Sequence, residues 1–351
     1  MKFKRLLIAI GAIALLTGLS ALTLITGCTK PAEESTWDIK LQTDAALETD
    51  QKWLVATYFA ERVDYYTEGR VVLDLRPAGE LCTSRTALEA VSTGAVSAVA
   101  LPAPALAGGH PEVLFELVPG VVPTGYKDLM PILDAGVGDI MDNSFAKDNV
   151  KLACYYTVGA NCCSTAKNGY LKTPEDFKGL KVAGPGPLEV EILSALGAGA
   201  TQIPSPDMYT SLQTGLIDAA ITGVQGSWSD KLYEVAPYWT YYGTDLIGEI
   251  PFAIIFSLDL WNTFPEDIQE GIMKASRDVT ENVTRDFSYP EIDSILKQLA
   301  DIGITVERLT PAERDALQAI TQEPARQWFL KTGGDLAAEI VDICTQYYES
   351  Q

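Results

Sequence analysis

Few residues of this chain have the type and spacing that catalysis requires. His110 is the one histidine among 351 residues, and so the one side chain able to act as a base at neutral pH without a shifted pKa. It lies in Gly108-Gly109-His110-Pro111, a turn sequence, which favours a structural role. The sequence contains no G-x-S-x-G, H-E-x-x-H or G-x-x-x-x-G-K-[ST] motif. Carboxylates are abundant, but no pattern selects an acid–base pair. We therefore do not expect an enzyme.

Cofactor and metal motifs are also missing. The Gly184-Pro185-Gly186-Pro187 turn is a weak match to a phosphate loop, because its prolines remove the N–H groups that such a loop needs. The six cysteines form no C-x-x-C pair, and one histidine cannot complete a zinc site. We expect no metal and no cofactor. We expect Cys162 and Cys163 to be buried thiols. A disulfide that uses Cys82, Cys154 or Cys344 is an alternative that the sequence leaves open.

The composition is that of an acidic globular protein of about two domains. The chain has 47 Asp and Glu residues against 26 Lys and Arg, a net charge of −21. This charge argues against binding to nucleic acid, which requires cations that neutralise phosphates, and against anionic membrane surfaces. With 47% hydrophobic and 21% charged residues, the chain is not of a disordered type.

The N-terminus has the layout of a secretory signal peptide. Lys2, Lys4 and Arg5 precede an apolar run over 6–25, which ends in Ile25-Thr26-Gly27-Cys28. These four residues resemble a bacterial lipobox, so we expect residues 1–27 to be a lipoprotein signal peptide and Cys28 to be lipidated. Residues 28–36 then form a tether. The alternative is an uncleaved membrane anchor, since the run is long enough to span a bilayer. Both place the folded part outside the cytoplasm, on a bacterial membrane.

Hydrophobic periodicity predicts strands that alternate with helices. Helices are expected at 50–67, 84–94, 187–197, 206–214, 230–235, 266–300 with an interruption near Pro290, 311–331 and 334–348. Strands are expected at 39–42, 70–75, 95–101, 150–157, 180–183, 201–203, 218–222 and 251–258. The last strand is apolar throughout, as a central strand is. The pattern predicts two α/β lobes with a ligand cleft between them, followed by long C-terminal helices.

An ordered set of segments resembles the solute-binding proteins of tripartite ATP-independent periplasmic (TRAP) transporters. Upstream segments of the set are Ala78-Gly79-Glu80-Leu81 and 88–94. The central ones are 173–182, from Thr173-Pro174-Glu175 to Leu180-Lys181-Val182, then Leu196-Gly197-Ala198, 208–220 and Lys231-Leu232-Tyr233-Glu234-Val235. Leu260-Trp261, Phe264-Pro265-Glu266 and Gly303-Ile304-Thr305-Val306 follow. Segments 107–111 and Asp218-Ala219-Ala220 are similar to its 2-oxo-acid and lactate-type branch.

The resemblance implies a hinged, two-lobed fold of the periplasmic-binding-protein type (type II-like) that closes on a small solute and delivers it to small and large TRAP membrane subunits. Lobe I is expected at 37–157 plus about 250–290, and lobe II with the C-terminal helices at 158–249 plus about 291–351. Hinge segments are expected at 157–159 and 248–251. Two other functions stay open: a sensory binding lipoprotein without a transport role, and a secreted hydrolase of unrecognised type.

The solute-reading positions depart from this family. Most members place an Arg after the Gly-Leu-Lys-Val strand, where its planar fork holds a substrate carboxylate, but this chain has Ala183 there. The Glu-Trp pair that the oxo-acid branch uses in metal-assisted binding is replaced by Ile221 and Thr222. The upstream strand that often supplies a second Arg has Asn161. Because a buried carboxylate without a cation is costly, we expect a neutral or weakly polar, atypical solute.

Several side chains are candidate solute contacts. Those at positions that match the family's ligand-facing sites are Asn161, Ala183, Thr222, Thr244, Asp245, Thr83 and Ser84. Ser84 can alternatively cap a helix. Tyr155, Tyr156 and Trp228 could stack on a solute, although core packing is the alternative role for each. Asp44, after the first strand, could accept from a solute donor or lie solvated in a loop.

Overall fold

The computed structural model describes residues 35–45, 48, 51–122, 126–158 and 162–351. Residues Thr36–Gln351 form one compact unit. The expected signal peptide, Cys28 and Asn161 lie outside the described residues. Within those residues, no helix is both long and apolar enough to cross a membrane.

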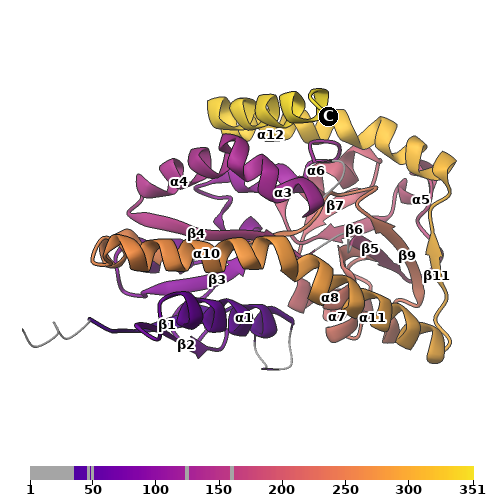
Figure 1. The fold of residues 1–351 in the computed structure, drawn as a ribbon. Coiled ribbons are helices and arrows are strands. Elements are labelled where there is room, and N and C mark those ends of the chain that lie inside the picture. Colours follow the sequence, from indigo (N-terminus) through magenta and orange to yellow (C-terminus); the bar gives the residue numbers. More distant parts are fainter. Residues whose placement is uncertain (1–34, 46–47, 49–50, 123–125, 159–161) are drawn as a thin grey trace, which may run out of the picture. The chain divides into compact units, whose positions relative to one another are not determined.

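The first sheet has five strands in the order β2-β1-β3-β10-β4 (Figure 1). β1 pairs in parallel with β2 and β3, whereas β10 runs antiparallel to both β3 and β4. Every residue of β10 is buried, which confirms the predicted central strand. The bounds are β1 Trp37–Thr43, β2 Val71–Arg76, β3 Ala98–Pro102, β4 Val150–Thr157 and β10 Pro251–Ser257.

The second sheet has six strands in the order β11-β9-β5-β8-β6-β7. β6, β7 and β8 are parallel, β5 is antiparallel to β8 and β9, and β11 is parallel to β9. The bounds are β5 Cys162–Ala166, β6 Lys181–Gly184, β7 Gly199–Gln202, β8 Ala219–Gly223, β9 Tyr238–Gly243 and β11 Val306–Arg308. The two sheets with their covering helices confirm the predicted α/β fold class.

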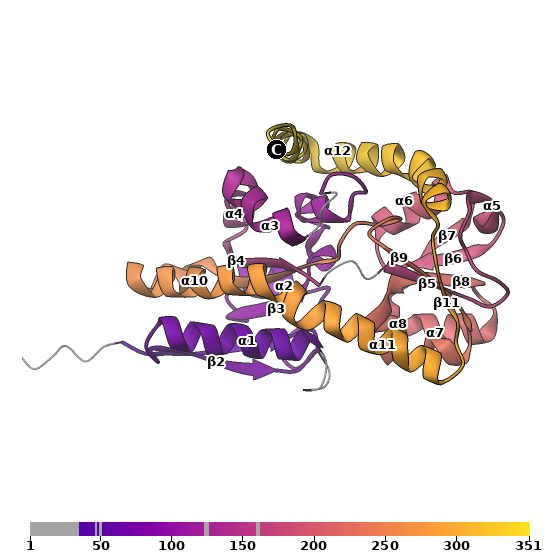
Figure 2. The same cartoon turned by 45° about the vertical axis from the view of Figure 1, so that its right-hand side comes forward.

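Helices cover both sheets (Figures 1 and 2). The α-helices are α1 Gln51–Tyr66, α2 Ala87–Ser92, α3 Tyr126–Ile132, α4 Gly138–Ala146, α5 Pro174–Phe177, α6 Pro187–Ala195, α7 Ser205–Thr214, α8 Val224–Ser229, α9 Leu258–Trp261, α10 Glu266–Val283, α11 Tyr289–Asp301 and α12 Pro311–Glu349. Short 3₁₀ helices are η1 Ala103–Leu106, η2 Pro111–Leu117 and η4 Leu232–Glu234, and π-helical turns are η3 Leu133–Val137 and η5 Thr284–Ser288.

One long helical path links the two sheets. The apolar residues of α10 recur every three or four positions, and this stripe packs against α1 and β4 of the first sheet. The η5 turn follows, and α11 then buries Ile292, Ile295 and Leu299 against the second sheet. The predicted interruption near Pro290 is therefore a π-helical turn, not a break. Pro290 lies in the first turn of α11, where its missing N–H costs little.

The C-terminal helices follow the prediction. α12 is divided at Gly334, whose φ of 57° and ψ of −137° are not helical, so two arms replace one continuous helix. Thr310 caps the first arm, because its hydroxyl accepts from the backbone N–H of Glu313 while the Glu313 carboxylate accepts from the Thr310 N–H. α12 packs on both η2 and α6.

Two predictions for the second sheet need correction. The helix expected at 230–235 is wrong, because α8 ends at Ser229, Lys231 adopts a positive φ of 55° and only a 3₁₀ turn follows. β9 was not predicted, although Tyr238-Trp239-Thr240-Tyr241-Tyr242 is rich in strand-forming residues. Among the described cysteines, Cys82, Cys154, Cys162, Cys163 and Cys344 are all free thiols.

Candidate functional site

Three segments connect the sheets, and they lie side by side. The chain crosses after β4, again between β9 and β10, and a third time at η5. The first two are joined because the Val158 N–H and the Thr157 hydroxyl both donate to the Ile250 carbonyl, each at 3.2 Å. The Thr284 hydroxyl of η5 donates to the Thr157 carbonyl at 2.5 Å. Both predicted hinge segments therefore lie at these crossings, apart from Gly159, which is outside the described residues.

Gln51 adds a fourth link between the two sheets. This side chain, at the start of α1, is 7% exposed. Its Nε2 donates to Ser288 Oγ in η5 at 2.5 Å, and its Oε1 accepts from Gln225 Nε2 in α8 at 3.1 Å. α8 directly follows β8, which carries Thr222. α1, which packs on the first sheet, is thus hydrogen-bonded to α8, the helix that follows the predicted solute contact Thr222 in the second sheet.

A group of hydrogen-bonded polar residues lies at the carboxyl end of β1 in the first sheet. The buried Gln42 amide donates to the Cys82 carbonyl at 2.7 Å and accepts from the Leu81 and Cys82 N–H groups, which fixes the loop before Thr83 and Ser84. The Ser84 hydroxyl donates to Asp44 Oδ1 at 2.7 Å. The alternative role of Ser84 as a helix cap is therefore wrong, since α2 is preceded by Thr86.

Asp44 is already paired in this group. Lys52 Nζ lies 3.4 Å from Asp44 Oδ2 and donates to the Asp44 carbonyl at 3.0 Å. The bond from Ser84 and the ion pair with Lys52 balance the Asp44 charge locally. Thr83 is exposed, and its hydroxyl bonds with that of Thr86 at 3.0 Å.

At the corresponding end of the second sheet, Ala183 lies inside the apolar core. Its exposed fraction is 0%, and it packs in one cluster with Cys163, Met208 and Ala220. Thr222 on the neighbouring strand is 8% exposed, and its Oγ1 lies 3.3 Å from Ser205 Oγ. Ala183 and Thr222, two of the predicted solute contacts, lie on the neighbouring strands β6 and β8. In this pair Ala183 is opposite Ala220.

Thr244 and Asp245 follow β9, both half-buried. Burial raises the pKa of the Asp245 carboxyl, the Arg314 charge lowers it, and the Asp315 carboxylate raises it. The three aromatic candidates differ. Tyr156 is buried and its ring stacks on that of Phe252, with 5.6 Å between the centroids. The Tyr155 hydroxyl donates to the Val113 carbonyl at 2.9 Å and its ring stacks on Phe115, which is a core arrangement. Trp228 is half-buried, with its ring centroid 4.9 Å from that of Tyr233.

A buried carboxylate that the sequence reasoning missed lies beside these strands. Glu189, in the first turn of α6, is 5% exposed. A Cβ on Gly186 would lie 2.5 Å from Glu189 Oε2, and one on Gly184 would lie 2.6 Å from Glu189 Cβ, so the two glycines make room for this side chain. Burial raises the pKa of Glu189 to about 7. The available signal was a Gly-x-Gly turn with Glu three residues after its second glycine.

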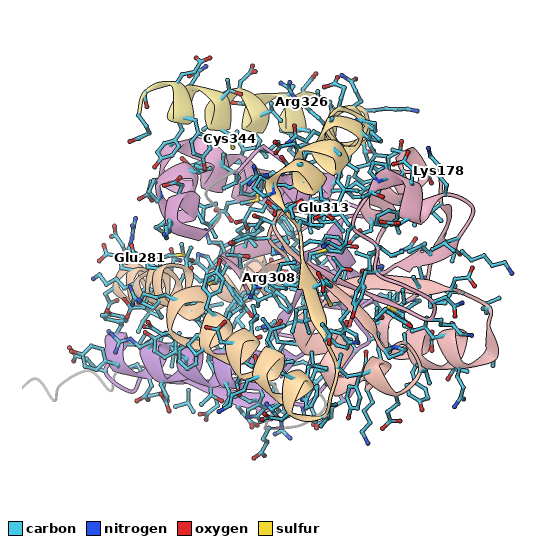
Figure 3. The ribbon with its side chains drawn as sticks, turned by 90° about the vertical axis from the view of Figure 1, so that its right-hand side faces the viewer. Lys178, Glu281, Arg308, Glu313, Arg326 and Cys344 are labelled. Atoms are coloured by element: carbon cyan, nitrogen blue, oxygen red, sulfur yellow. The ribbon has the colours of Figure 1, made fainter. Side chains whose placement is uncertain are left out.

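Two cavities lie elsewhere in the described part of the protein. One of about 520 Å³ separates the two arms of α12 from the 119–121 loop, with Arg326 and Cys344 in its lining (Figure 3). Another, of about 390 Å³, lies between α11 and β11 and includes Arg308. Neither is lined by a predicted solute contact. The described residues contain no group of three His, Cys, Asp or Glu side chains that could hold a metal ion.

Comparison with known proteins identifies the family. Residues 44–332 match the sequence profile of the bacterial extracellular solute-binding proteins, family 7 (DctP). The C4-dicarboxylate-binding periplasmic protein DctP of Rhodobacter capsulatus is 27% identical over 271 residues, which are 76% of this chain and 78% of that protein. The ectoine-binding periplasmic protein TeaA of Halomonas elongata is 23% identical over 236 residues, 66% of this chain and 67% of that protein.

The fold has solved counterparts. A TRAP periplasmic solute-binding protein from Desulfovibrio salexigens, solved with bound orotic acid, has a TM-score of 0.80 at 20% identity and covers 90% of this chain and 99% of its own. The relatives differ in the solutes that their names give, so they do not single out the 2-oxo-acid branch. The profile match covers most of the chain, and the protein belongs to the bacterial extracellular solute-binding protein family 7 (DctP).

Proposed function

We propose that this protein is a lipid-anchored, extracytoplasmic receptor that binds one small organic solute and delivers it to the small and large subunits of a TRAP-type secondary transporter. The observation that carries this proposal is the family membership over 44–332, on a fold whose two sheets are joined by adjacent crossings. Such an arrangement supports closure about the crossings when solute binds at the carboxyl ends of the strands. An anchor on Cys28 keeps the receptor close to its carrier and raises its local concentration there.

The solute is proposed to bind without a carboxylate–arginine pair. Support comes from Ala183, at a position where the resemblance to the family implies an Arg, and from its surroundings, which are apolar core. A guanidinium from this position would have to be buried among Cys163, Met208 and Ala220. The solutes named for relatives are C4-dicarboxylates, orotic acid and ectoine, each of which carries a carboxylate, so a solute without one would distinguish this chain from those relatives. A neutral or atypical solute fits these residues best.

Thermal unfolding against a broad solute panel tests the receptor function. Protein lacking residues 1–28 is mixed with organic acids, their amides, alcohols, amines and zwitterions. A solute at a hundredfold excess over its Kd should raise the free energy of unfolding by about 2.7 kcal/mol. Chromatography after long incubation should return that solute unchanged. Chemical turnover of the stabilising solute, or no stabilisation by any class, would contradict the proposal.

Fractionation of cells tests the anchor separately. The wild-type chain should remain with the membranes and take up labelled fatty acid, and Cys28→Ala should abolish labelling. Cys82→Ala is the matched control, since Cys82 lies in the folded unit, and it should label normally. Equal labelling of the Cys28→Ala protein would show that this cysteine is not the site.

A further inference from the structure

We infer that Glu189 is a specificity-determining residue of the solute site and that it selects a solute bearing a nitrogen donor, with a protonated amine or amidinium binding more tightly than an alcohol and a carboxylate being rejected. This inference rests on the proposed receptor function and adds the chemical class of the solute.

The location of Glu189 is the first argument. It lies in the first turn of α6, immediately after the carboxyl end of β6, which is the edge where open α/β sheets bind ligands. Its carboxylate is directed at Gly186, in the loop that follows Ala183. Burial, then the neighbouring Cys163 thiol, raises the pKa of the Cys162 thiol at the start of β5, and the Glu189 and Asp245 carboxylates raise it further.

The second argument is that no cation among the described residues balances the charge of Glu189. The exposed fraction of the side chain is 5%. No lysine, arginine or histidine of the described residues forms an ion pair with it. Within the same described part, no side chain donates a hydrogen bond to it, and its support is its own backbone N–H. By contrast, Asp44 at the corresponding edge of the first sheet is paired with Lys52.

These features together define what the site accepts. The positive end of a helix is the position where an anionic ligand would normally bind, and here the protein places its own carboxylate there. A solute carboxylate would meet Glu189, which forms no ion pair among the described residues, and Asp245, whose charge Arg314 offsets in part. A solute ammonium or amidinium would instead supply the donor that the buried carboxylate lacks. The absence of a cation at position 183 and the presence of this acid point in the same direction.

Headgroup-matched calorimetric titrations test the inference. The probes are benzylamine, benzyl alcohol and benzoate, and glucosamine, glucose and glucuronate, each set sharing one skeleton. In at least one set the wild-type protein should bind the amine at least tenfold more tightly than the alcohol, with the carboxylate weakest. Glu189→Gln should reduce the amine preference to within twofold. Glu191→Gln, two residues along the same helix, is the matched control and should retain it.

Gly186→Ala gives an independent variant. Its new Cβ would lie 2.5 Å from Glu189 Oε2, so it displaces the carboxylate while leaving its charge in the chain, and the amine preference should fall as in Glu189→Gln. Circular dichroism establishes that each variant is folded. An amine preference that survives in both variants, or a wild-type protein that prefers the carboxylates, would overturn the inference while leaving the receptor function intact. Failure of every probe and every panel solute to bind would contradict the receptor function itself.

Discussion

At the scale of single residues, burial penalises the charged form of Glu116. It is 1% exposed in η2, and neither carboxylate oxygen has a hydrogen-bond partner among the described residues. Burial, then the neighbouring Glu249 carboxylate, raises the pKa of Glu116 well above its ordinary value of 4.5. The nearby Tyr155 hydroxyl opposes this only weakly, because it donates to the Val113 carbonyl.

The sign of the resulting pH dependence follows from this raised pKa. Above pH 4.5 the unfolded chain releases the Glu116 proton while the folded protein retains it, so stability falls as the pH rises towards the folded pKa. Glu116→Gln removes this penalty. We expect the variant to be more stable than the wild type at pH 8 by about 1 to 3 kcal/mol, with the difference shrinking towards pH 4.5. Urea unfolding at several pH values measures it.

Glu112 provides the matched control in the same 3₁₀ helix. Burial tends to raise its pKa, but hydrogen bonds from His110 and Ser144 outweigh burial and hold the pKa below its usual value. Its ionised form therefore stabilises the fold above the ordinary carboxyl range, and Glu112→Gln should lower stability at pH 7. A Glu116→Gln variant that is less stable than the wild type at pH 8 would show that Glu116 has a partner or a charge role.

At the scale of elements, the β9–β10 crossing depends on the absence of a side chain at Gly248. A Cβ there would lie 1.7 Å from the Glu116 carbonyl oxygen, while the Gly248 N–H donates to the Leu117 carbonyl at 3.0 Å. The crossing and η2 are thus in backbone contact. Because backbone atoms cannot move aside cheaply, Gly248→Ala should destabilise the protein by about 3 kcal/mol or more.

Gly108→Ala is the control for this prediction. A Cβ at Gly108 has no heavy atom within 4 Å, so the substitution should change the midpoint of thermal unfolding little. Differential scanning calorimetry of both variants measures the difference. Equal midpoints for the two variants would mean that the crossing can move away from η2.

At the scale of the whole molecule, Gln51 couples the two sheets. Its bonds to Ser288 and Gln225 join α1 to η5 and α8, so Gln51→Ala should lower the stability by about 1 to 2 kcal/mol. Amide exchange should speed up at the start of α1 and in α8 together. Gln269→Ala is the control, since Gln269 bonds only to nearby carbonyls of Trp261 and Phe264. Unchanged amide exchange in α8 would show that Gln51 does not couple this helix to α1.

Local pattern predicted much of this architecture but little of the solute site. The strands β1–β4, β6–β8 and β10 and the division of α12 near Gly334 follow from periodicity and turn residues. β9 was missed because aromatic residues, not alternation, mark it. Ala183 could be singled out only by resemblance, and its burial in the core depends on helices distant in sequence.

The buried acids were unpredictable for a related reason. Glu116, Glu189 and Glu249 look like ordinary surface carboxylates among 47 acidic residues, because sequence position does not reveal which elements enclose them. The burial of these acids arises from tertiary packing. η2 lies against the β9–β10 crossing, and α6 lies near the start of β5 in the second sheet. The burial of these carboxylates is therefore a property of the assembled fold.

Solute headgroup preference is the central claim of this account, and isothermal titration of the wild-type protein tests it most directly. Each acid, such as glucuronate or orotic acid, is compared with its own carboxamide, so that only the charge and donor capacity of one group change. We predict that for the skeleton that fits, the amide binds at least tenfold more tightly than the acid. Tighter binding of the acid would contradict the claim, and would mean that a cation at another position than 183 holds the solute.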